Sequence, residues 1–173
     1  ILIPDDAYYG AHTLRAVENF PVSGYRLYKT FIEAFAYVKM ACAQTNMEVG
    51  YLDSGKAQAI ISACQEIIQG RLREQIVVDA FQGGAGTSTN MNFNEVLANR
   101  ALEILGHSRG AYSHIHPIDH VNMHQSTNDV YPTALRVASL SLLKELETEV
   151  ASLQQALQQK EEEFRDVVKL GRT

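Results

Sequence analysis

Apolar residues recur at helical intervals in the first half of the chain. Between residues 28 and 49 they are spaced four, three and four apart, at Phe31, Phe35, Val38 and Cys42. This is the spacing of one face of an α-helix. Gly50 follows directly and is a residue typical of helix ends. The pattern therefore predicts a helix from about Tyr28 to Val49.

Two further stretches show the same period. Asp53 or Ser54 is suited to cap a second helix that ends at Gly70. Its apolar stripe consists of Ala57, Ile60, Ile61, Cys64, Ile67 and Ile68. A third helix is expected from near Asn94 to Leu105, with Gly106 at its end. The remaining segments before residue 131, namely 1–25, 76–93 and 106–131, lack a strong period and are expected to be irregular.

The last part of the chain predicts one very long helix. Pro132 suits a first helical turn, with Asn128 or Asp129 as the cap, and no Gly or Pro follows until after Leu170. Apolar residues form a heptad-like seam at Leu146, Val150, Leu153, Leu157, Phe164 and Val168. Such a helix would be roughly 58 Å long. We therefore expect the seam to pack against other parts of a longer chain or against other subunits.

Composition narrows the class of protein. The chain has 173 residues, of which 46% are apolar, and a formal net charge of −5. This apolar fraction is enough for a packed core and excludes a disordered chain. No apolar run is long enough to cross a bilayer, and the start of the sequence lacks the pattern of a signal peptide. The acidic balance without a basic block argues against a nucleic-acid partner.

Cysteine usage agrees with a cytoplasmic location, which is our expectation. The two cysteines, Cys42 and Cys64, lie within helical apolar patterns. We interpret them as buried, reduced thiols and not as a disulfide.

A glycine-rich segment at residues 81–95 is the first candidate for chemistry. Three glycines precede a run of Thr, Ser and Asn side chains, which is suited to hydrogen-bond an anion without adding charge. Thr87 follows Gly86 where a Walker-type loop needs a lysine, and Thr89 replaces the third glycine of a dinucleotide fingerprint. Both nucleotide sites are therefore disfavoured. A plain turn into a capped helix remains the alternative.

A histidine-rich segment at residues 114–129 is the second candidate. Its histidines are spaced two, four and four apart, which invites a metal site. However, no Cys or Glu completes a ligand set and Pro117 interrupts any shared helix, so loop hydrogen bonds are the favoured interpretation. The triplet Ser126-Thr127-Asn128 is interpreted most simply as a capping cluster. A nucleophile elbow and paired catalytic carboxylates are not evident.

Taken together, these motifs resemble the aspartase/fumarase superfamily. The resemblance rests on Tyr8-Tyr9-Gly10-Ala11-His12-Thr13-Leu14-Arg15 near the start and on Gly84-Ala85-Gly86-Thr87-Ser88-Thr89-Asn90-Met91-Asn92. It continues through His116-Pro117-Ile118-Asp119-His120-Val121-Asn122, through Gln125-Ser126-Thr127-Asn128-Asp129 and to Gly171-Arg172-Thr173. Ile118 departs from the Asn that is common in the superfamily, which argues against a secondary anion site there.

The resemblance implies an all-α fold: an N-terminal helical domain at residues 1–125, and the start of a central helical-bundle domain at residues 126–173. It also implies a homotetramer whose active sites combine segments of three subunits, with no membrane partner. By position, Thr87, Ser126 and Thr127 would hold the substrate β-carboxylate. Asn128 would lie near the amino group, and Thr173 near the α-carboxylate.

The implied reaction is reversible β-elimination of ammonia from L-aspartate to give fumarate, through an aci-carboxylate intermediate. The base would be a serine on a later loop, so we assign no catalytic residue within these 173 and expect this fragment to be inactive by itself. No metal ligand and no cofactor is assigned, and activation by a divalent cation is left open. Two alternatives are a fumarate hydratase of the same superfamily and a non-catalytic helical oligomerisation module. Tyr9 and Thr127 resemble aspartases more than fumarases.

Overall fold

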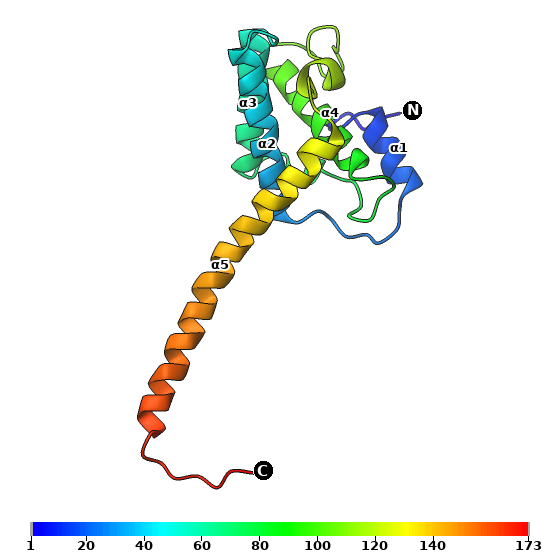
Figure 1. Ribbon diagram of the computed structural model, residues 1–173. Coiled ribbons are helices and arrows are strands. Elements are labelled where there is room, and N and C mark those ends of the chain that lie inside the picture. The colour runs from blue at the N-terminus through cyan, green and yellow to red at the C-terminus, as the bar shows by residue number, and fades with distance from the viewer. Residues whose placement is uncertain (1, 173) are drawn as a thin grey trace. The chain divides into compact units, whose positions relative to one another are not determined.

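The computed structural model describes residues 2–172. Over this range it contains helices and turns and no strand, as the sequence predicts (Figure 1). The α-helices are α1 (Ala11–Asn19), α2 (Lys29–Glu48), α3 (Ser54–Ile68), α4 (Thr87–Ile104) and α5 (Thr127–Phe164). A 3₁₀ turn, η1 (Arg73–Gln75), and a five-residue π-helix, η2 (Pro117–Val121), lie in the connections. The chain divides into two compact units, residues 1–138 and 139–173.

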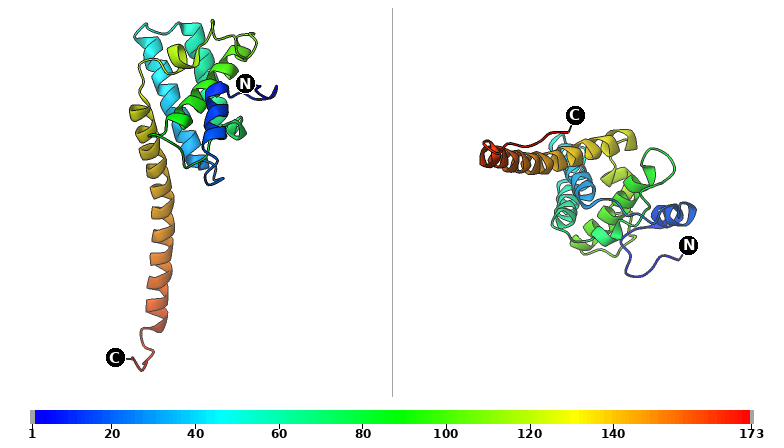
Figure 2. Two further views of the ribbon diagram at one scale, coloured as in Figure 1. Left: turned by 90° about the vertical axis from the view of Figure 1, so that its right-hand side faces the viewer. Right: turned by 90° about the horizontal axis from the view of Figure 1, so that it is seen from below.

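The first unit is built on the α2–α3 hairpin. Helix α4 packs against α3, and α1 packs against α4 (Figures 1 and 2). The predicted apolar stripes of α2 and α3 form much of the core, where Phe35 stacks on Phe93 of α4 with ring centroids 4.4 Å apart. Asp53 caps α3 as predicted, since its carboxylate accepts a hydrogen bond from the backbone N–H of Lys56 at 3.1 Å.

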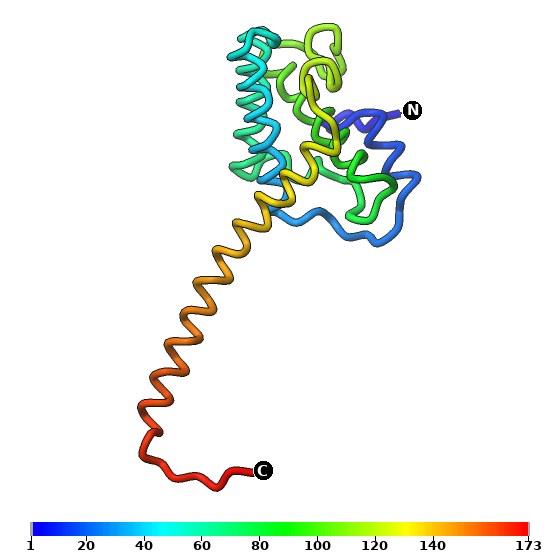
Figure 3. Tube along the Cα trace, in the orientation of Figure 1, coloured from blue at the N-terminus to red at the C-terminus, as the bar shows by residue number. Residues whose placement is uncertain are grey.

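Three sequence-based helix boundaries were wrong. Helix α4 begins at Thr87 instead of near Asn94, because Gly86 adopts a positive φ of 89° and the polar residues that follow are buried in helical conformation. Helix α5 begins at Thr127 and ends at Phe164, so Pro132 is its sixth residue and Val168 lies beyond the helix. Segment 106–131, expected to be irregular, contains η2 and the start of α5 (Figure 3).

Helix α1 lies within the first 25 residues, which were expected to be irregular. Helix α1 was missed because a buried carboxylate holds it in place, so its sequence needs no apolar stripe. The side chain of Glu95 on α4 is 3% exposed and accepts bonds from the backbone N–H groups of Gly10, His12 and Thr13 at 2.8, 3.0 and 3.0 Å. The hydroxyl of Thr13 donates a further bond to it at 2.6 Å. The carboxylate thus satisfies N–H groups at the first turn of α1.

The cysteines fit the prediction in part. Both are free thiols, but Cys42 is only half-buried while Cys64 is fully buried. Cys42 is half-buried because it lies at the edge of the α2 stripe, where it lines a small pocket with Thr45 and His124.

The second unit consists of the later turns of α5 and residues 165–172. Its seam residues Leu146, Val150, Leu153 and Leu157 are between 53% and 63% exposed in the single chain. Within residues 2–172, no helix is long and apolar enough to span a membrane.

Replacing Glu95 with Gln should lower the free energy of unfolding by about 3 kcal/mol, because an amide NH₂ would face buried N–H donors that now share a carboxylate. Urea unfolding followed by circular dichroism measures the change. The matched control is Glu48→Gln on the exposed end of α2, where a change within about 0.5 kcal/mol is expected. Equal effects of the two substitutions would contradict the anchoring role of Glu95.

Stability should also depend on pH through Lys39, whose side chain is fully buried. Burial lowers the pKa of Lys39 from 10.5 to about 7, so between these values the unfolded chain binds more protons than the folded chain. The free energy of unfolding should therefore rise by about 1 kcal/mol from pH 7 to 8.5, below the range where the raised thiol pKa values of Cys42 and Cys64 act in the opposite direction. Urea unfolding at both pH values checks this. The rise should be lost in Lys39→Met.

Candidate active site

The glycine-rich segment brings the start of α4 against the start of α5. A Cβ atom on Gly86 would lie 2.1 Å from a ring carbon of Tyr131, so only glycine allows this approach. Tyr131 is one helical turn after Thr127, and a pocket of about 470 Å³ is bounded by residues 80–86 and Tyr131, together with Phe20 and Val22. The two helix N-termini, which carry partial positive charge, therefore lie together.

The start of α5 forms a capping box. The hydroxyl oxygen of Ser126 accepts a bond from the N–H of Asn128 at 3.1 Å, and the carboxylate of Asp129 accepts one from the N–H of Ser126 at 3.1 Å. Ser126 is therefore the cap where the sequence suggested Asn128 or Asp129. The capping interpretation of the triplet is confirmed, and the Ser126 hydroxyl still has its proton to donate.

Thr127 is held by α4. Its Oγ1 accepts a bond from Nδ2 of Asn90 at 3.0 Å, which joins the first turns of the two helices. Thr87, the first residue of α4, is exposed, as are Ser126 and Asn128. Within residues 2–172, no hydrogen bond joins Thr87 to Ser126 or Asn128. Four of the five expected site residues thus lie at the two helix starts, and Thr173 lies outside the described residues.

A buried polar network behind these helix starts was missed by the sequence interpretation. The ammonium of Lys39 on α2 donates to Oδ1 of Asn122 and to Oε1 of Gln125, both at 2.9 Å. Nδ2 of Asn90 donates to the same Asn122 oxygen at 3.0 Å. One signal was available: Lys39 lies four residues after Phe35, within the apolar face of its helix.

Three of the four histidines, His116, His120 and His124, make hydrogen bonds, as favoured, and His114 stacks on His107. Nδ1 of His116 accepts from the N–H groups of Ile118 and Asp119, each at 3.2 Å, and His124 contacts Oδ1 of Asn46 at 2.8 Å. Burial and the neighbouring Lys56 lower the pKa of His120. Among the described residues, no group of three His, Cys, Asp or Glu side chains is arranged to hold a metal.

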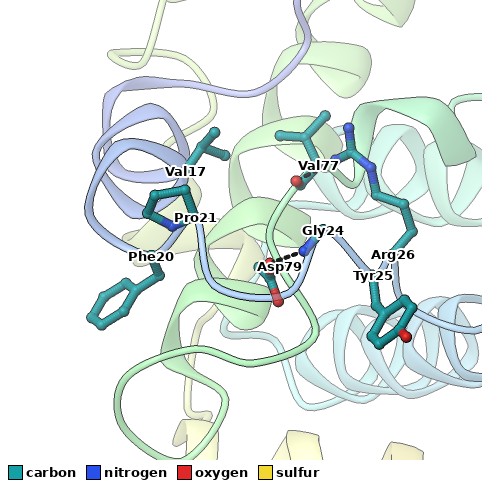
Figure 4. Close-up of a pocket in the computed structure, with 8 residues that line it drawn as sticks. All are labelled: Val17, Phe20, Pro21, Gly24, Tyr25, Arg26, Val77 and Asp79. Atoms are coloured by element: carbon teal, nitrogen blue, oxygen red, sulfur yellow. Dashed lines mark hydrogen bonds between the residues drawn. The ribbon is translucent and has the colours of Figure 1, made fainter.

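A second pocket, of about 250 Å³, shares Phe20 with the first and is lined by none of the expected site residues (Figure 4). Its floor is fixed by Asp79, whose carboxylate accepts bonds from the Ser23 hydroxyl and from the N–H of Gly24. The hydrogen bond from the Ser23 side chain, with those from nearby backbone N–H groups, holds the pKa of Asp79 below its ordinary value. Because these bonds already occupy the carboxylate, we assign this pocket no chemistry.

Comparison with known proteins shows the family of this chain. The model of a family described as lyase matches residues 1–173. The chain is 52% identical over 171 residues to an aspartate ammonia-lyase of Bacillus subtilis (strain 168) and 47% identical over 174 residues to one of Escherichia coli (strain K12). Each alignment covers 99% of this chain and 36% of the relative, so the chain spans about a third of the length of these relatives.

Solved structures give the same result. A fumarate lyase:delta crystallin from Brucella melitensis is 54% identical with a TM-score of 0.95, covering 99% of this chain and 40% of that one. A class II fumarase from Schistosoma mansoni is 36% identical with a TM-score of 0.94, covering 100% and 37%. The family model spans the chain and relatives of about 50% identity agree with it. This chain therefore belongs to the lyase family, the aspartase/fumarase superfamily that its motifs resemble.

Proposed function

We propose that the whole protein containing this chain is an aspartate ammonia-lyase. The observation that carries the proposal is the meeting of two helix N-termini through Gly86–Tyr131 and Asn90–Thr127, where uncharged donors surround the positive ends of two helix dipoles. Such a site suits a carboxylate. The similarity to aspartate ammonia-lyases favours L-aspartate as the substrate and fumarate and ammonia as the products.

The proposed roles follow from what each group donates. Thr87, Ser126 and Thr127 hold the β-carboxylate, Asn128 lies near the amino group, and Thr173 near the α-carboxylate. A base takes the C3 proton, and the electron pair of the broken C3–H bond spreads into the β-carboxylate. The C2–N bond then breaks to release ammonia. Hydroxyl donors aimed at the β-carboxylate bind more strongly as its charge grows, which lowers the barrier.

The family resemblance also supports proposals about the base, the domains and the assembly of the whole protein. We propose that the base is a serine on a later segment, so that residues 1–173 alone do not catalyse the reaction. We also propose that residues 1–125 form the N-terminal helical domain and that residues 126–173 begin a central bundle of four subunits. The half-exposed seam at Leu146, Val150, Leu153 and Leu157 supports this assembly, because it leaves a continuous apolar face for partner helices.

Incubating the whole protein with L-aspartate should raise the ultraviolet absorbance of fumarate and release ammonia in equal amounts. A fumarate hydratase is the second candidate, because a class II fumarase shares the fold at 36% identity. Absorbance that rises with L-malate and not with L-aspartate would establish that alternative and contradict the proposal.

In the whole protein, Thr127→Val should lower kcat/KM for L-aspartate by a hundredfold or more, because one hydroxyl donor to the developing charge is removed without a change in size. The matched control on the same helix is Thr133→Val. The Thr133 hydroxyl bonds only the backbone carbonyl of Asp129 among the described residues, and its loss should change kcat/KM less than twofold. Equal losses of kcat/KM in the two variants would contradict the proposed contact between Thr127 and the substrate.

A further inference from the structure

Below its lowered pKa of about 7, Lys39 carries an isolated positive charge in the interior. Its side chain is fully buried. Within residues 2–172 its ammonium donates hydrogen bonds only to the amide oxygens of Asn122 and Gln125, and it lies 5.9 Å from the ring centroid of Phe35. Among the described residues, no Asp or Glu forms an ion pair with Lys39. The nearby thiols of Cys42 and Cys64 have raised pKa values and so bring no negative charge. A buried lysine without a carboxylate partner is costly, so a compensating role is expected.

This ammonium sets the orientation of a chain of amides. An ammonium can only donate, so Asn122 must present its oxygen to Lys39. The same oxygen accepts Nδ2 of Asn90 at 3.0 Å and Nδ2 of Asn94 at 3.2 Å, while Nδ2 of Asn122 turns to the carbonyl of Gln125 at 2.9 Å. The side-chain oxygens of Asn90 and Asn94 are buried and receive no hydrogen bond from any of the described residues. This pattern is expected if Lys39 sets the donor-to-acceptor direction of each hydrogen bond in the chain of amides.

The chain of amides ends at Thr127. Nδ2 of Asn90, directed by Asn122, also donates to Oγ1 of Thr127. Because that oxygen already accepts a bond from an N–H donor, the hydroxyl proton cannot point to Asn90. It is free to donate away from the network, in the direction that a carboxylate acceptor requires.

We propose that Lys39 is a positioning residue: acting through Asn122 and Asn90, it fixes the Thr127 hydroxyl as a donor to a substrate carboxylate, and its charge strengthens that donor. The inference rests on the proposed function, since it takes Thr127 as a contact of the dicarboxylate substrate. Lys39 itself touches no substrate. It also supplies positive charge behind a site whose proposed contacts in this chain are all neutral.

The test compares three forms of the whole protein: wild type, Lys39→Met and Lys39→Gln. Succinate, a dicarboxylate that lacks a leaving group, is titrated as a competitive inhibitor, and KM and kcat are measured with L-aspartate, all at a pH below 7, where Lys39 is charged. Ki is the decisive value, because it does not change when a variant merely lowers the fraction of folded enzyme. We expect Ki for succinate to rise about tenfold or more in Lys39→Met. Lys39→Gln, which retains a donor for Asn122 without the charge, should give a smaller rise.

The control is Lys56→Met, which removes a lysine whose ammonium contacts His120, outside the network, and which should leave Ki within twofold of wild type. A Ki in Lys39→Met within twofold of wild type overturns the inference. If Lys39→Met does not fold, Lys39→Gln decides in the same way. Direct binding of succinate distinguishes the two proposals. A wild type that binds succinate but releases no ammonia from L-aspartate contradicts the proposed function alone, and the Lys39 variants still test the network by their Kd for succinate.

Discussion

The need to hydrogen-bond every buried polar group organises the first unit around α4. This helix buries Asn90, Asn92, Asn94, Glu95 and Asn99, an unusual set for a helix with core contacts. Each forms hydrogen bonds with a loop or with the residues at the start of another helix. Glu95 holds the start of α1, Asn92 bonds the backbone of residues 75 and 77, and Asn99 bonds the carbonyl of Tyr8 and the N–H of Gly110. The loops thus have defined positions because α4 offers them partners.

Sequence reasoning succeeded where apolar burial determines structure. The stripes of α2 and α3 predicted both helices to within about a residue, since period and end signals agree there. It failed where polar contacts decide. Helix α1 and the first two turns of α4 have inward-facing Thr and Asn side chains, which by their intrinsic preferences favour turns and caps. Their partners lie far away in sequence, so no local pattern could reveal them.

The candidate site shows the same division. Thr87, Ser126, Thr127 and Asn128 were named because their motifs resemble those of a known superfamily, and the structure places them at two adjoining helix starts. Their contacts with substrate remain a proposal. Lys39 and Asn122 were not named as site residues, since a single lysine in an apolar stripe gives no hint of which amide it meets. Only the fold brings the two groups together.

The span of these contacts has a consequence for the order of folding. The α2–α3 hairpin joins neighbours in sequence, whereas Lys39 meets Asn122 across 83 positions and Glu95 meets Gly10 across 85. Closing such long loops is slow compared with forming local helices. During synthesis from the N-terminus, the hairpin can form while residues beyond 122 are still in the ribosome. The two helix starts therefore acquire their geometry last, and the proposed carboxylate site forms only when this unit is complete.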